Sequence, residues 1–195
     1  MRYLTSSLFA EGPSDTLFLA DLLTRQVREL LWAGDQAETD RVQVEGCHTV
    51  DSRERLQSEI LEVAQTSNII FIHNDHREAK KIEALRSALD GRLPRRTRLV
   101  PIVPRAETDA WCLIDAAAFR ANRGAECSLL PSRPADVERI ADPKAVLAKV
   151  VGTRRANDAL ELLGANVSLK RLAEVPAYRL FLDDLTTALK ELNFS

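Results

Sequence analysis

The stretch NIIFIHND (68–75) contains a short, unbroken, β-branched apolar run with polar residues directly after it. Runs of this kind are typical of strands that are buried on both faces, as the central strands of parallel sheets are. The stretch therefore predicts a central strand that delivers His73, Asn74 and Asp75 to one edge of a sheet.

The segments on either side alternate between strand-like and helix-like patterns. Further strands are expected at 3–10, 41–46 and 97–104, the last at a sheet edge or with an irregular end because it contains prolines. Helices are expected between them from apolar residues at helical spacing and from capping signals. Their ranges are 14–34 with Ser14 and Asp15 as N-cap candidates and Gly34 beyond the end, 51–65 with a capping box of Asp51 and Glu54, 77–91 ending at Gly91, and 107–122. This alternation predicts an α/β fold with a mostly parallel sheet, right-handed crossovers and helices on both faces.

The character of the chain changes near Gly124. Beyond it the sequence is rich in loops and then shows only helical segments, at 143–151, 155–163 and 176–192. We expect residues 1–123 to form the α/β core and residues 124–195 to form a helical extension packed on it. No flexible linker separates the two parts, so they are expected to fold together.

The composition excludes several classes of protein. The 195 residues carry a net charge of −2, which argues against a protein that coats DNA without specificity. The three cysteines are widely spaced and odd in number, a pattern that favours reduced thiols in the cytoplasm over a disulfide framework. No apolar stretch is long enough for a membrane span, and no glycine-rich phosphate loop is present.

Three of the expected strands end in loops that carry acids: Glu11, Asp75 and Glu107. The carboxyl ends of parallel strands meet at one edge of a sheet, so these side chains are expected to converge there. Converging carboxylates repel one another unless a cation lies between them, and hard oxygen ligands suit Mg²⁺ or Mn²⁺. The spacing therefore predicts a divalent-metal site at this edge.

The same acids also have simpler explanations. Glu11 can serve as a turn residue beside Gly12. Glu107 can be a helix N-terminal acid that the macrodipole favours, and Asp15 and Asp109 share that explanation.

The strand-end motifs resemble the TOPRIM fold, the metal-binding domain of topoisomerases, primases and OLD-type nucleases, in which a Glu-Gly follows the first strand and an Asp-x-Asp follows a later one. The chain resembles in particular a bacterial family of TOPRIM-like domains of unknown function, over nearly its whole length. The motifs that carry this resemblance are EGPSD (11–15), FIHND (71–75), VPIVPRAETDAWCLID (100–115), LLPSRPADVERIADPKAVL (129–147) and EVPAYRLFLDDL (174–185).

The resemblance implies a metal-dependent nuclease. Glu11 would act as general acid or base, Asp75 and Glu107 would hold one or two Mg²⁺ or Mn²⁺ ions, and His73 and Asp109 are further candidate ligands. The resemblance also implies a partner ATPase of the ABC or AAA type, in defence against phage. The alternative is a TOPRIM-shaped protein-interaction module without catalysis.

His73 marks a departure from the TOPRIM pattern, because it stands where the first acid of Asp-x-Asp would be. An imidazole is a poor ligand for Mg²⁺ and a better one for Mn²⁺. His73 and His76 are three residues apart, but no further ligand follows at zinc-finger spacing, so the pattern argues against zinc.

The stretch GRLPRRTR (91–98) contains four arginines. Such a run is usually a solvated loop, and beside a nuclease site it would neutralise phosphates instead. The candidate nucleic-acid-binding residues are Arg92, Arg95, Arg96 and Arg98, with the pair at 154–155 as a weaker candidate.

Overall fold

The computed structural model describes residues 2–32, 37–47, 53–75, 79–121, 124–152 and 156–194. It shows the expected α/β fold, with a central sheet whose four strands are all parallel. Their order across the sheet is β4 (Gln43–Cys47), β2 (Ser6–Ala10), β5 (Ile69–His73) and β6 (Arg98–Ile102). The proline-containing strand β6 is at an edge, as its composition predicts.

A second, two-stranded sheet pairs β1 (Arg2–Leu4) with β3 (Ala37–Thr39). The strand expected over 3–10 is thus interrupted at Thr5, and β3 is an element that the sequence pattern did not predict. At the interruption, the hydroxyl of Thr5 donates to the carbonyl of Thr66 at 2.7 Å, and the backbone N–H of Thr5 donates to the Asn68 side chain at 3.1 Å.

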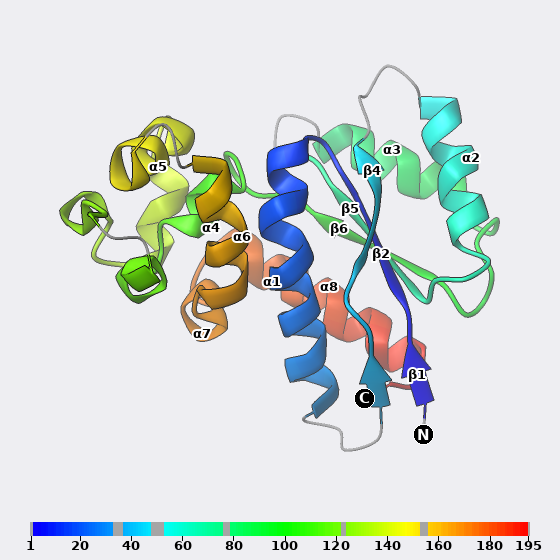
Figure 1. The fold of residues 1–195 in the computed structure, drawn as a ribbon. Helices are drawn as coiled ribbons and strands as arrows, with labels where there is room; N and C mark the ends of the chain where they lie inside the picture. Colours follow the sequence, from blue (N-terminus) through cyan, green and yellow to red (C-terminus); the bar gives the residue numbers. More distant parts are fainter. Residues whose placement is uncertain are drawn as a thin grey trace.

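Helices cover both faces of the central sheet (Figure 1). One face packs against α1 (Pro13–Trp32) and α8 (Pro176–Glu191), and the other against α2 (Arg53–Val63) and α3 (Ala79–Leu89). Neighbouring strand residues alternate between the two faces, as the two-residue period of a strand requires. Phe71 belongs to the cluster with α1 and α8, whereas Ile70 and Ile72 belong to the cluster with α2 and α3.

Apart from α8, which packs on the sheet, the helical extension lies beyond the sheet on the side of α1 (Figure 1). The helices expected at 143–151, 155–163 and 176–192 are found as α5 (Pro143–Val151), α6 (Ala156–Asn166) and α8. The remaining short elements are α4 (Asp109–Cys112), α7 (Leu169–Leu172) and the 3₁₀ turns η3 (Ala116–Ala121), η4 (Cys127–Leu129) and η5 (Pro134–Arg139).

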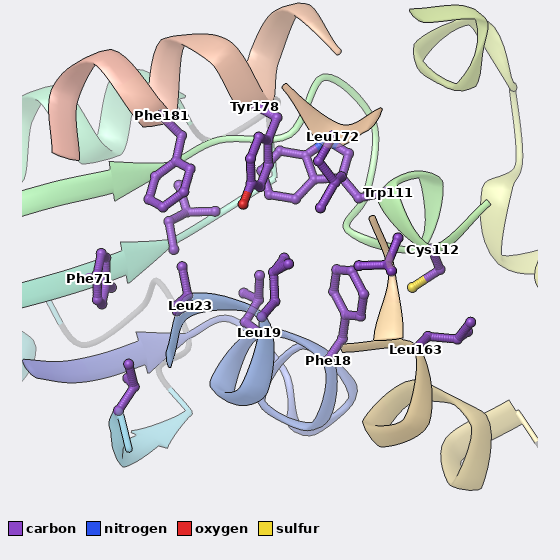
Figure 2. Packing of buried hydrophobic residues seen from close by; sticks show 14 of the residues in the cluster. Phe18, Leu19, Leu23, Phe71, Trp111, Cys112, Leu163, Leu172, Tyr178 and Phe181 are labelled. Carbon is purple, nitrogen blue, oxygen red and sulfur yellow. The ribbon is translucent and has the colours of Figure 1, made fainter. Parts of the chain in front are cut away.

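The hydrophobic core is continuous across residue 123. Figure 2 shows Phe18 and Leu19 of α1 facing Trp111 of α4 and Tyr178 of α8. The rings of Trp111 and Tyr178 meet edge to face with centroids 5.0 Å apart. One apolar cluster therefore joins residues of the α/β core to residues of the extension.

The prediction of one continuous helix over 107–122 is wrong. The α-helix ends at Cys112, and a 3₁₀ turn begins at Ala116. All four residues from Trp111 to Ile114 are buried, so this stretch has no solvent-facing side of the kind that a surface helix keeps. The carboxylate of Asp115 then accepts the N–H of Ala117 at 2.9 Å, which favours a turn over a continued helix.

Other boundaries differ in detail. The helix α1 begins at Pro13, which places Ser14 and Asp15 in its first turn and not at the N-cap. Gly34 and Asp51, which were expected to end one helix and begin the next, are outside the described residues.

Candidate functional site

The acids expected to converge do come together at the carboxyl ends of the strands. Glu11 follows β2 directly, Asp75 lies two residues beyond β5, and Glu107 and Asp109 follow β6 at the start of α4. Because β2, β5 and β6 are adjacent and parallel, these loops lie on one edge of the sheet. Asp15, in the first turn of α1, belongs to the same group. We call these five residues the acid cluster.

The carboxylates of the acid cluster are close enough to perturb one another's ionisation. Burial, followed by the charges of Glu11, Asp15, Glu107 and Asp109, raises the pKa of Asp75 from 3.8 to about 7. Burial and the charges of Glu107 and Asp15 likewise raise the pKa of Asp109 to about 6, against an opposing effect of Lys144. The cluster thus holds more negative charge than its surroundings neutralise.

Glu11 joins the end of β2 to the end of β5. Its Oε2 accepts the backbone N–H of Asp75 at 3.1 Å and the Nδ2–H of Asn74 at 3.4 Å. Its own N–H donates to Nδ1 of His73 at 3.4 Å. These bonds give Glu11 a defined orientation, which a residue that merely solubilises a turn would not need.

Asp15 connects further loops of the site. One of its oxygens accepts the N–H of Gly12 at 3.0 Å, and the other accepts the hydroxyl of the buried Thr108. A Cβ atom on residue 12 would lie 3.1 Å from the Asp15 carboxylate, so glycine leaves room for this contact. The sequence alone indicates only an N-cap or helix-dipole role for Asp15, although its position four residues after Glu11 was a usable signal.

His73 is fully buried between two members of the acid cluster. Its Nδ1 lies 3.8 Å from Oδ2 of Asp15, and its Nε2 lies 3.7 Å from Oδ1 of Asp75. Because Nδ1 accepts the N–H of Glu11, the proton of the neutral ring is on Nε2, which faces Asp75. The geometry therefore favours a positioning role for His73. His76 is outside the described residues.

Glu107 has a buried carboxylate oxygen, Oε2, that lacks a donor among the described residues. A buried carboxylate oxygen is costly unless a donor or a cation satisfies it. Asp15 accepts a hydrogen bond at each oxygen and Glu11 accepts two at Oε2, so Asp75, Glu107 and Asp109 are the carboxylates with the least support from hydrogen-bond donors among the described residues.

An oxygen-rich donor set of this kind fits Mg²⁺ or Mn²⁺. In the described part of the chain, however, no three His, Cys, Asp or Glu side chains are arranged as a ready-made chelate. The carboxylates are therefore in electrostatic contact without being drawn to a common point, and an ion would have to draw their side chains closer.

The arginines of the 91–98 run lie at the amino-terminal end of β6, whereas the acid cluster lies at the carboxyl ends of the strands. Arg98 begins β6, whereas Glu107 and Asp109 follow the end of that strand. The arginines thus do not flank the acid cluster, which was the condition for their proposed role at the catalytic site. Arg95 and Arg98 instead line an open groove of about 640 Å³ between α3 and α8.

Most arginines in this run bind the protein itself. Arg92 donates to the carbonyl of Ala88 near the end of α3, and Arg96 donates to the carbonyl of Gln65. Arg98 pairs with Glu191 at 2.5 Å and also donates to the carbonyls of Arg95 and Thr97. These contacts favour a structural role, and nucleic-acid binding by the run stays a prediction.

The raised pKa values predict how stability depends on pH in the absence of metal. The unfolded chain releases the Asp75 proton near pH 4, whereas the folded protein retains it until the pKa of about 7. The folded state binds more protons over this interval, so the free energy of unfolding should fall as the pH rises from 5 to 8. Urea unfolding with EDTA across this range tests the prediction, and Mn²⁺ should restore stability at pH 8. A free energy that rises steadily to pH 8 without metal would contradict it.

No family model matches this chain, and no curated protein or solved structure matches it either. The resemblance to TOPRIM proteins therefore rests on the sequence motifs alone. Across the described residues, no helix is long and apolar enough to cross a membrane.

Proposed function

We propose that the protein is a divalent-metal-dependent phosphodiesterase that acts on nucleic acid. The observation that carries the proposal is the convergence of five carboxylates at the carboxyl ends of adjacent parallel strands, where burial and the other four charges raise the pKa of Asp75 to about 7. Such a concentration of charge destabilises the metal-free fold, and perturbed groups of this kind are concentrated at functional sites. The motif resemblance to TOPRIM nucleases supports the same reading.

In this proposal Asp75, Glu107 and Asp109 hold the ion, because their charges are the least satisfied by protein donors. The bound ion would polarise a phosphoryl oxygen and lower the pKa of a bound water. Glu11, fixed through Oε2, keeps Oε1 to accept or donate a proton. Asp15 and His73 position the loops that carry these groups.

The test is cleavage of labelled DNA and RNA oligonucleotides with Mn²⁺ or Mg²⁺. We expect metal-dependent cleavage that EDTA abolishes and that falls by about 10²–10³-fold in Glu11→Gln, because the variant keeps the side-chain shape but cannot exchange a proton. Glu83→Gln, which changes an exposed carboxylate of α3, is the matched control and should cleave like the wild type. Absence of cleavage above background in the wild type, with Glu11→Gln no different, would rule the enzyme out.

A second candidate is a TOPRIM-shaped interaction module without catalysis. It is favoured by the lack of a ready-made chelate among the described residues and by His73 at the position of a TOPRIM acid. The two candidates differ in their response to metal, because an ion that binds only the folded state raises its stability by mass action. A melting temperature that does not move with millimolar Mn²⁺ would favour the module. The ATPase partner that the resemblance implies is compatible with either candidate.

A further inference from the structure

A cation from the helical extension acts on the acid cluster. Lys144 lies in the first turn of α5, and α5 packs against α4, which contains Asp109. The positive charge of Lys144 opposes the effect of the carboxylates on Asp109. The extension thus brings a positive charge to the edge of the sheet where the acids converge.

The position of Lys144 in the backbone is well defined. Asp142 caps α5 by accepting the N–H of Ala145 at 2.8 Å, and the buried Pro143 occupies the first turn of the helix. The Lys144 side chain itself is exposed and makes no hydrogen bond or ion pair within the described residues. Its ammonium group thus starts from a fixed point of the helix that packs against α4, and it is not committed to another group of the described residues.

The substrate of the proposed reaction would be stabilised by such a cation in addition to the metal ion. A phosphodiester carries a negative charge, and the acid cluster repels it. The arginines of the 91–98 run cannot offset this repulsion locally, because they lie at the opposite ends of the strands and mostly bind backbone carbonyls. A lysine ammonium is a compact point charge that binds phosphate oxygens well.

We propose that Lys144 binds the phosphate group of the substrate and holds it beside the acid cluster. This inference rests on the proposed function and assigns the substrate-binding side of the site to the helical extension. Lys144 contacts the substrate in this proposal and does not ligate the metal.

The experiment compares Lys144→Ala, Lys144→Arg and the control Lys149→Ala, which removes an exposed lysine from the other end of α5. The probe is a fluorescent single-stranded DNA oligonucleotide, measured by anisotropy with Ca²⁺ over a salt series and by cleavage with Mn²⁺. We expect Lys144→Ala to raise Kd and KM about tenfold, with a smaller change in kcat. The slope of log K against log salt should become shallower by about 0.7, the value for one phosphate contact on a single strand. Lys144→Arg should restore most of the binding.

Manganese affinity supplies the readout that separates substrate binding from metal binding. Because Lys144→Ala removes a positive charge, Mn²⁺ affinity should be unchanged or higher. A lower Mn²⁺ affinity, or DNA binding and cleavage equal to those of Lys149→Ala, would overturn the assignment while leaving the proposed function in place. A wild-type protein that neither binds nor cleaves the oligonucleotide would overturn both.

Discussion

Replacing Asp75 with asparagine is expected to stabilise the metal-free protein at pH 8 and to remove its metal-dependent activity. The amide keeps the shape of the side chain but cannot carry the charge that burial and four carboxylates oppose. A pKa displaced from 3.8 to about 7 corresponds to roughly 4 kcal/mol if taken in full. Because the side chain is 31% exposed and solvent screens its charge, we expect about 1–2 kcal/mol.

The gain should be smaller at pH 5, where the folded wild type keeps the Asp75 proton and only the unfolded chain ionises, and it should vanish below about pH 4. Cleavage, by contrast, should fall by about 10²–10³-fold at every pH, because a ligand oxygen has been lost. Urea unfolding at both pH values, with EDTA and with Mn²⁺, measures the first effect, and oligonucleotide cleavage measures the second. Asp183→Asn, at an exposed position of α8, is the control and should change neither stability nor cleavage. An equal change in stability at pH 5 and pH 8 would show that charge is not the cause.

Replacing Gly164 with alanine is expected to lower stability by about 3 kcal/mol, with a fall in Tm of about 6–12 °C. A Cβ atom on residue 164 would lie 2.3 Å from the carbonyl oxygen of Phe18 on α1. A backbone atom cannot swing aside as a flexible side chain can, so α6 would have to move away from α1. That movement would also strain the bonds from Arg25 to the carbonyls of Gly164 and Val167, each 2.8 Å long.

The direction of the stability change distinguishes a steric clash at residue 164 from an effect of helix propensity. Alanine is favoured over glycine inside a helix by about 1 kcal/mol, so an uncrowded position would be stabilised by the substitution. Asn157→Ala, at an exposed position of the same helix, is the matched control and should leave Tm unchanged or slightly raised. Thermal and urea unfolding of both variants gives the comparison, and a Gly164→Ala protein as stable as the wild type would show that α1 and α6 do not approach this closely.

The order of the central-sheet strands and of the helices α1, α2, α3, α5, α6 and α8 followed from the sequence, because each of these elements carries its own repeating pattern. The apolar run of β5 and the amphipathic spacing of α5 and α8 do not depend on distant residues. The convergence of Glu11, Asp75 and Glu107 also followed, since parallel strands with acids just beyond their ends must place those acids on one edge.

The break in the predicted helix at 107–122 was decided by packing. The sequence pattern there is helical, but burial of Trp111 through Ile114 on all sides leaves the stretch no exposed face. Local propensity amounts to fractions of a kcal/mol per residue, whereas burying a large side chain is worth several times more, so the tertiary contacts prevailed.

Only the tertiary structure decided which residues the functional side chains contact. Asp15 binds Thr108, 93 positions away, and Arg25 binds the carbonyl of Gly164, 139 positions away. The contact between α5, which carries Lys144, and α4, which carries Asp109, likewise depends on how whole elements pack, and so does the location of the 91–98 arginines at the opposite ends of the strands. Periodicity reports which face of an element is buried but not which distant residue meets it. The sequence by itself therefore determined the fold class and the edge that carries the acids, while their hydrogen bonds, their raised pKa values and the approach of the helical extension arose only when the chain had folded.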